Sequence, residues 1–424
     1  MQTTETLTWS ATWVFIILLV LHTLTRWWLD SRQMRHIHRH AQAVPDAFAG
    51  RIELAEHQKA AQYSLAKLKL SAWDIALDAF VLLGWTLLGG LNALNQWLLS
   101  WLEPGITQQL VLVISFVFIG GLLHLPLSLL QTFGIEQRFG FNRITPALWV
   151  SDLLKGVALG LVLGVPILWV VLKLMAVGGQ NWWCWAWLAL VAYQLLVMWI
   201  APHFIMPLFN KFTPLEDEEL KTRVSELMLR SGFTAKGFFV MDGSRRSAHS
   251  NAFFTGFGSA KRVVFFDTLL KQLNAGEMQA VLAHELGHFK HKHVIKMMIR
   301  SFATTLIGLG VLGWLAHQVW FYMALGTTPV LTQTADNHAL ALILFMLVMP
   351  LPLFFLTPLS SFMSRKQEFE ADAYAAQHAQ AQDLRAALLK LYKDNASTLT
   401  PDPVFVAFYY SHPPAIQRLA RLGV

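Results

Sequence analysis

Seven apolar runs divide the chain, and each is long enough to cross a lipid bilayer. They lie at about residues 11–29, 72–102, 109–130, 147–175, 182–206, 295–323 and 338–362. Because a transmembrane helix needs about 20 mostly apolar residues, this pattern predicts about seven transmembrane helices. The first run lacks the basic region and the small-residue cleavage site of a signal peptide, which indicates a retained span.

Two long polar segments interrupt the apolar pattern, at residues 207–294 and from residue 363 to the end. In the first, residues 216–231 have a helical pattern, and residues 251–267 read as a β-hairpin with a turn near Gly256 and Gly258. We therefore expect a membrane domain of five helices, a catalytic segment, two further membrane helices and a second catalytic segment. Their expected bounds are 1–206, 207–294, 295–362 and 363–424.

The composition supports a polytopic membrane protein over a chain of soluble domains. Hydrophobic residues make up 55% of the 424 residues and charged residues only 14%, and the mean hydropathy is +0.44. The single cysteine, Cys184, excludes an internal disulfide bond and a cysteine-rich metal site.

The positive charges indicate how the chain is oriented in the membrane. No Lys or Arg occurs in residues 1–10 or in the connections at 103–108, 176–181 and 324–337, whereas the other connections contain nearly all of them. Positive residues collect on the cytoplasmic side, so the N-terminus is predicted outside and the C-terminus inside. The net charge of +7 is then explained without a nucleic-acid partner, and none is expected.

Residues 283–288 read Ala-His-Glu-Leu-Gly-His, which is the H-E-x-x-H pattern of zinc hydrolases. On a helix, His284 and His288 lie on one face and can bind one metal ion, and Glu285 lies beside that ion. Asn274 is placed to cap this helix, and Glu277 suits its first turn. A helix with two incidental histidines is the alternative, since a bare match to this pattern is not decisive.

A catalytic zinc ion needs a third protein ligand and an open position for water. Glu368 is the favoured candidate, with Asp372 four residues later on the same helical face, where it could bind the far nitrogen of a ligating histidine. His291 is a less favoured alternative, because a straight helix cannot fold three histidines around one ion. A solvated acidic face is also possible, in which Glu370 would be equivalent to Glu368.

With these residues in view, the chain resembles the CAAX prenyl endopeptidases (type I), which are multispanning membrane zinc metalloproteases of the gluzincin group. The resemblance covers most of the chain and rests on several ordered motifs. They are Leu282 to Lys290 with His293, Ser364 to Ala375, Ser247 to Gly256, Phe266 to Leu270, Ile135 to Asn142, Ile205 to Leu215, and Ser411 to Pro414 with Arg418.

The resemblance implies an all-α polytopic fold of about seven transmembrane helices around a water-filled chamber. A cytoplasmic α+β gluzincin-type zinc protease domain with a small β-hairpin or sheet would close the chamber. Polar residues in or near the spans agree with such an interior, although hydrogen bonds between helices explain each one equally well. They are Asp74, Asp78, Asn92, Asn95, His124 and Asp152.

The family's site also carries over residue by residue. Glu368 falls on the zinc-ligating glutamate, so the metal ligands would be His284, His288 and Glu368. Asn251 and His412 would bind the water, the substrate or the developing oxyanion, and Arg418 would support them. For His412, a cap at the end of a helix is the alternative, and His293 is expected to be structural. The strand with Asn251, Ala252, Phe253 and Phe254 would bind substrate.

One difference between this chain and the eukaryotic members of the family bears on the source of the protein. Eukaryotic members carry a charged insertion before the metal helix, whereas here only Lys271 to Ala280 intervene. This compact form favours a bacterial inner-membrane protein, and the ER membrane would apply to a eukaryotic one. Since few bacteria prenylate proteins, the family's named substrate need not be the one cleaved here.

The sequence therefore predicts a membrane-embedded zinc endopeptidase that cleaves membrane-associated or prenylated CAAX-type peptides. One Zn²⁺ ion per chain would activate water, and Glu285 would act as general base. The expected partners are a peptide substrate and the lipid bilayer, with a monomer possible. The alternative is a non-proteolytic quality-control factor that clears or gates translocating chains, although such a factor has no need of Glu285.

Overall fold

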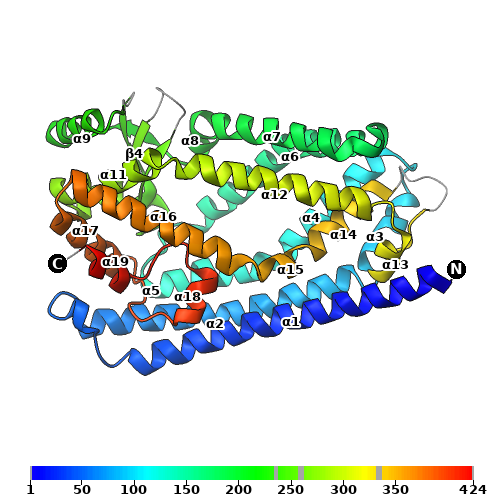
Figure 1. Ribbon diagram of the computed structural model, residues 1–424, viewed down its shortest axis with the longest axis horizontal. Coiled ribbons are helices and arrows are strands. Elements are labelled where there is room, and N and C mark those ends of the chain that lie inside the picture. The colour runs from blue at the N-terminus through cyan, green and yellow to red at the C-terminus, as the bar shows by residue number, and fades with distance from the viewer. Residues whose placement is uncertain (1, 234–236, 256–261, 331–336, 423–424) are drawn as a thin grey trace.

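The computed structural model describes residues 2–233, 237–255, 262–330 and 337–422. Long helices run along the length of the molecule, as Figure 1 shows. Helix α1 starts at one end, and the short C-terminal helix α19 lies near the other, together with α9, α11, α17 and strand β4. The expected mainly helical fold with a small sheet is therefore confirmed.

The helices of the membrane part fall into two groups along the chain. The first group is α1 (Gln2–His40), α2 (Leu54–Trp85), α3 (Gly90–Leu99), α4 (Ile106–Leu129), α5 (Gln137–Phe139), α6 (Pro146–Val177), α7 (Trp182–Ile200) and α8 (Met206–Phe209). The second group is α12 (His293–Leu315), α13 (Val319–Ala324), α14 (His338–Val348), α15 (Pro350–Phe354) and α16 (Thr357–His378). Two π-helical turns, at Leu130–Glu136 and Ala201–Ile205, continue α4 and α7.

Among the described residues, five helices are long and apolar enough to span a membrane, and seven spans result if each bent helix pair counts as one. In each of the five, only 6–11% of the most apolar stretch is buried within the protein. A helix in a soluble protein would bury its apolar face, so these surfaces are suited to lipid. The prediction of about seven spans agrees with this arrangement.

Two of the apolar runs are broken rather than straight. The run at 72–102 bends by 49° between α2 and α3, where Gly89 adopts a left-handed conformation with φ of 77°. The run at 338–362 bends by 66° before α16. Helix α16 then continues without interruption to His378, so the expected segment boundary at 362/363 falls inside this helix.

Among its described residues, the protease part contains six short helices and a four-stranded sheet. The helices are α9 (Glu218–Arg230), α10 (Asp267–Gln272), α11 (Ala275–Lys290), α17 (Ala381–Asp394), α18 (Pro403–Tyr409) and α19 (Ala415–Arg421). The strands are β1 (Phe212–Pro214), β2 (Phe238–Met241), β3 (Ala252–Thr255) and β4 (Arg262–Phe266), in the order β1-β2-β4-β3.

The expected β-hairpin is confirmed. Strands β3 and β4 pair antiparallel, with Ala252 opposite Phe265 and Thr255 opposite Arg262. The expected turn with Gly256 and Gly258 lies outside the described residues. Strand β4 also pairs parallel to β2, which leaves β3 at the edge of the sheet. The helix expected at 216–231 is confirmed as α9.

Several contacts join the inner loop and α6 of the membrane part to the protease part, and two of them fix its orientation. Arg246 makes a two-pronged ion pair with Asp152 of α6, with N–O distances of 2.8 and 3.0 Å. Asn142, in the loop after α5, forms an isolated backbone bridge with Ser247. Fork-shaped Arg–carboxylate pairs fix orientation as well as position, so they align the two parts.

The other polar residues expected in the spans have three kinds of partner. Asn95 accepts a 2.7 Å hydrogen bond from Gln108, and Asn92 accepts one from the backbone N–H of Thr328. Asp78 forms a 2.7 Å ion pair with Arg26, and His124 lies between Asp74 and Asp78. The amides thus make local hydrogen bonds, whereas the acidic residues form a charged cluster.

Candidate metal centre

The sequence of helix α11 explains both its start and its buried face. Asn274 accepts a hydrogen bond from the backbone N–H of Glu277, whose carboxylate accepts one from the backbone N–H of Asn274, each at 2.9 Å. This reciprocal cap satisfies two N–H groups at the start of the helix. Met278, Leu282 and Leu286 are buried, as the apolar pattern predicts, and this fixes the rotation of α11 about its axis.

A glycine lets helix α16 approach α11 closely at the level of the two histidines. A Cβ atom added at Gly287 would lie 2.9 Å from the Cα and 3.1 Å from the carbonyl oxygen of Ala371. Backbone atoms cannot move aside as a flexible side chain can, so only glycine permits this separation. The Gly287 contact therefore brings Glu368 and Asp372 of α16 next to His284 and His288 of α11.

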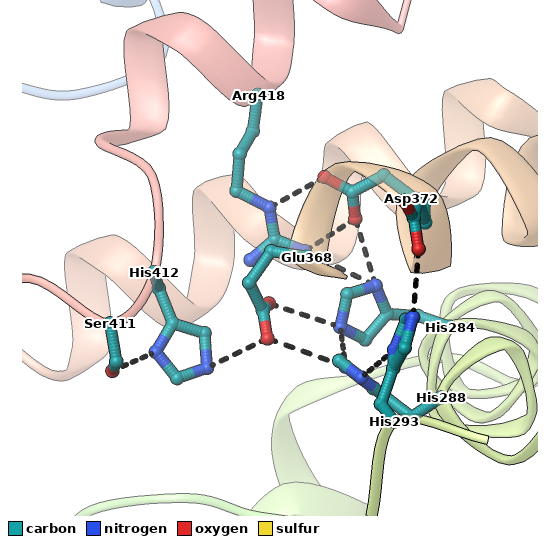
Figure 2. A network of polar contacts seen from close by, with 9 residues as sticks. His284, His288, His293, Glu368, Asp372, Ser411, His412 and Arg418 are labelled. Carbon is teal, nitrogen blue, oxygen red and sulfur yellow. Dashed lines mark hydrogen bonds and ion pairs between the residues drawn. The ribbon is translucent and has the colours of Figure 1, made fainter. Parts of the chain in front are cut away.

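The structure brings His284, His288 and Glu368 together (Figure 2). The two Nε2 atoms lie 3.3 Å apart, His284 Nε2 lies 3.4 Å from Glu368 Oε2, and His288 Nε2 lies 3.3 Å from Glu368 Oε1. The two histidines are separated from Glu368 by about eighty positions in sequence, yet the three ligand groups form a compact triangle, in which each histidine lies nearest to a different oxygen of the Glu368 carboxylate.

The distance between the two Nε2 atoms, and the distance from each of them to its nearer Glu368 oxygen, are close to those around a tetrahedral metal ion. Ligand bonds of about 2.0–2.1 Å in a tetrahedral zinc site give ligand–ligand separations of about 3.3–3.4 Å. Glu368 Oε2 is also buried, and among the described residues no donor makes a hydrogen bond to it. A buried carboxylate oxygen without a donor is costly, and a bound cation at this position would supply the missing partner.

The second nitrogen of His284 faces an anion that is itself held in place. Asp372 Oδ1 lies 2.8 Å from His284 Nδ1, and Arg418 donates two hydrogen bonds, of 2.5 and 2.8 Å, to the Asp372 carboxylate. Although burial lowers it, the pKa of His284 is raised to about 9 by the adjacent carboxylates of Asp372 and Glu368. The two carboxylates therefore favour positive charge on this ring.

The second nitrogen of His288 begins a chain of hydrogen bonds. His288 Nδ1 lies 2.9 Å from His293 Nδ1, and His293 Nε2 lies 2.9 Å from Glu370 Oε2. Because Glu370 accepts from His293 Nε2–H, His293 Nδ1 can accept from His288 Nδ1–H, which leaves His288 Nε2 free as a ligand. We did not expect His293 and Glu370 in this role, and no spacing pattern links these two residues, which are 77 positions apart.

Three further residues from the sequence analysis line one cavity of about 430 Å³ beside the ligand set. Glu285 is half-buried there, and burial raises the pKa of its carboxyl group. Asn251 is exposed and its side-chain oxygen accepts from the backbone N–H of Ala252. His412 Nε2 lies 3.5 Å from Glu368 Oε1, and Tyr410 rather than His412 caps the end of α18.

The expected substrate-binding residues form the edge strand above this cavity. Ala252 lines it, and Phe253 packs edge-on against Phe266 with ring centroids 6.2 Å apart. The backbone of Phe254 pairs with Val263 of β4. Ser250, which belongs to the motif from Ser247 to Gly256, lines the same cavity. Sequence reasoning missed Tyr392, which also lines it and belongs to no spacing pattern that marks a site.

Two other groups of described residues have ligand atoms close enough for a metal ion, and both are weaker candidates. In the group of His291, His293 and Glu370, the hydrogen bonds to His288 and Glu370 occupy both nitrogens of His293. In the group of Asp74, Asp78 and His124, the carboxylates face opposite nitrogens of one ring, and Asp78 is already paired with Arg26.

Comparisons with known proteins agree with this site and fold. Residues 33–211 match the family described as CAAX prenyl protease N-terminal, five membrane helices, and residues 214–423 match peptidase family M48. CAAX prenyl protease 1 of Saccharomyces cerevisiae is 39% identical over 319 residues, which cover 71% of this chain and 69% of that protein. CAAX prenyl protease 1 homolog of Oryza sativa subsp. japonica is 32% identical over 423 residues, 95% of each chain.

A solved structure extends the similarity to the whole fold. The crystal structure of S. mikatae Ste24p superposes with a TM-score of 0.90 and 31% sequence identity, over 97% of this chain and 98% of that one. The ligand triangle, the membrane helices and these matches lead to one conclusion. The chain belongs to the CAAX prenyl protease family of peptidase family M48, and it is an integral, multi-pass membrane metalloendopeptidase.

Proposed function

We propose that this peptidase binds one zinc ion per chain through His284, His288 and Glu368 and uses Glu285 as its general base. The observation that carries the proposal is the ligand triangle, in which the two Nε2 atoms lie 3.3 Å apart and each lies 3.3–3.4 Å from one oxygen of the Glu368 carboxylate. Two imidazoles and one carboxylate are a known catalytic zinc set that leaves one position open.

When bound, the metal supplies a Lewis acid that activates a water molecule and polarises the scissile carbonyl group. Glu285 takes the proton of the attacking water and delivers it to the leaving amine. Its raised pKa suits this exchange, because the carboxyl group then holds the proton more readily between the two steps. Asn251 and His412 line the same cavity and donate hydrogen bonds to the developing oxyanion.

Arg418 and Asp372 position the metal ligands rather than touch the substrate. Arg418 holds the Asp372 carboxylate, and Asp372 holds His284 in the tautomer whose Nε2 faces the site. Both side chains are buried, with exposed fractions of 6% for Arg418 and 3% for Asp372.

The substrate binds as an extended strand along the free edge of β3, which contains Ala252, Phe253 and Phe254. Backbone hydrogen bonds to an edge strand fix the register of a peptide with little demand on its side chains. The substrates are membrane-associated peptides of the prenylated CAAX type, which is the substrate class that the names of the relatives state.

The enzyme acts as a monomer in a membrane, without a nucleic-acid partner. Its N-terminus lies outside, and its C-terminus and active site lie in the cytoplasm, because Lys and Arg are absent from alternate connections. The short connection from Lys271 to Ala280 supports a bacterial inner membrane as the location, whereas the relatives reported above are eukaryotic.

The test is a peptidase assay on purified, zinc-loaded Glu285→Gln protein. We expect turnover to fall by about 10²–10⁴-fold, the contribution typical of a general base, with zinc content unchanged. Glu226→Gln is the matched control, because Glu226 is exposed on α9, and it should keep full activity. Wild-type turnover by the Glu285→Gln protein would contradict the proposed mechanism.

A further inference from the structure

A second cavity adjoins the cavity of the metal centre. It has a volume of about 710 Å³, and helices α1, α2 and the segment from α17 to Pro414 line it. The two cavities share Tyr392, Asn395, Ser397 and His412 as lining residues. Both volumes are in the range of ligand-binding pockets, so a peptide in the first cavity can extend directly into the second.

The direction of β3 indicates which end of a peptide enters the second cavity. Antiparallel pairs are more common than parallel ones, and a peptide antiparallel to β3 passes Asn251, Ser250 and His249 as it runs towards its carboxyl end. Ser250 and Asn251 line the first cavity, whereas His249 lines the second. The residues after the scissile bond are therefore directed into the second cavity.

Three lysine or arginine side chains line the two cavities, and two of them are neutralised. Arg418 is paired with Asp372, and Arg26 is paired with Asp78. The third, Lys67 of α2, is exposed in the second cavity, and no carboxylate of the described residues lies within ion-pair distance of it. Of these three side chains, Lys67 is therefore the one whose positive charge is available to an anionic ligand in the two cavities.

The surroundings of Lys67 hold its side chain on the cavity wall. Its Nζ lies 5.0 Å from the centroid of the Tyr63 ring, a favourable cation–π distance. Tyr63 is itself fixed, since its hydroxyl donates a 2.7 Å hydrogen bond to Glu136, and Glu136 Oε2 lies 3.8 Å from His249 Nε2. This chain of contacts connects Lys67 to the residue that precedes β3 by three positions.

We propose that Lys67 binds the carboxylate at the carboxyl-terminal end of the substrate, and this inference rests on the proposed peptidase function. An ammonium group and a carboxylate form a strong, charge-assisted hydrogen bond. Two sources can supply that carboxylate: the free α-carboxylate of the last residue, or an acidic side chain. We infer the α-carboxylate, because the carboxyl-terminal direction of the peptide leads to this cavity.

The experiment compares three forms of one internally quenched S-farnesyl peptide that ends three residues after the prenylated cysteine. The first ends in a free carboxylate, the second in a C-terminal amide, and the third in an amide with glutamate as its last residue. We expect the wild-type protein to cleave the free acid with a kcat/KM about tenfold above that of the amide, mainly through KM. The third peptide should behave as the second.

In the Lys67→Met protein, the kcat/KM for the free acid should fall to near that for the amide. The Lys67→Arg protein should recover most of the preference for the free acid. Lys69→Met is the matched control, because Lys69 is exposed on the same helix and does not line either cavity. It should keep the wild-type preference for the free acid. Zinc content and thermal melting of each variant report whether it is folded.

Several outcomes would overturn the proposal. One is that the wild-type protein cleaves the free acid and the amide with equal kcat/KM. Another is that Lys67→Met lowers the kcat/KM for both peptides by the same factor, so that the preference for the free acid is unchanged. If the wild-type protein cleaved the glutamate amide as well as the free acid, Lys67 would bind an acidic side chain of the substrate instead of its α-carboxylate. Absence of cleavage of all three peptides by the zinc-loaded wild type would instead refute the proposed function.

Discussion

At the scale of single residues, the site is a set of ligand atoms whose orientation depends on a surrounding layer of hydrogen bonds. Each histidine of the ligand triangle uses its second nitrogen, His284 towards Asp372 and His288 towards His293. A histidine offers Nε2 to a metal only while Nδ1 carries the proton, so these partners select the reactive tautomer. The sequence pattern predicts the ligands and also Asp372, but it does not show the part that His293 and Glu370 take in this layer.

The first prediction at this scale concerns His293. Replacement by phenylalanine keeps a ring of similar size and removes the acceptor for His288 Nδ1–H, which should weaken zinc binding by about 10–100-fold. The measurement is zinc retention against a competing chelator. His291→Phe is the matched control, because His291 is exposed on the same turn. If the His291→Phe protein lost zinc and the His293→Phe protein kept it, His293 would not be the residue that supports His288.

At the scale of secondary-structure elements, the site depends on how closely α11 and α16 approach. The caps and the apolar pattern predict α11 well, because Asn274, Glu277 and the buried leucines act within one helix. The separation of the two helices is set by Gly287 and Ala371, which are far apart in sequence. No local pattern encodes that contact, so the sequence supplied the ligand Glu368 only through spacing and family resemblance.

The element-scale prediction is that Gly287→Ala separates the two helices. The added methyl group would meet backbone atoms of Ala371 at 2.9 and 3.1 Å, and relief of this overlap should cost about 1–3 kcal/mol of stability. It should also move Glu368 away from the histidines and reduce zinc retention. Thermal melting and zinc analysis in detergent provide the two measurements.

Gly308→Ala in α12 is the control for that prediction. A Cβ atom at Gly308 would lie 3.8 Å from the Phe345 ring, which is ordinary contact, so stability and zinc content should stay near wild type. If both glycine variants behaved like the wild type, close approach of α11 and α16 would not be what assembles the site.

At the scale of the whole molecule, hydropathy predicts which segments enter the membrane but not how they bend or pair. The breaks between α2 and α3 and before α16 interrupt runs that read as continuous in sequence. The pairing of Asp78 with Arg26 and of Asp152 with Arg246 joins segments far apart along the chain. The adjoining cavities, the second of which Lys67 lines, depend on such long-range contacts.

The central claim is that one zinc ion lies among His284, His288 and Glu368. Diffraction data from crystals of the purified protein, collected on both sides of the zinc absorption edge, test it most directly. We predict a single anomalous peak per chain within bonding distance, about 2.0–2.2 Å, of these three side chains. A peak at His291, His293 and Glu370, or at Asp74, Asp78 and His124, with none at the ligand triangle would contradict the account.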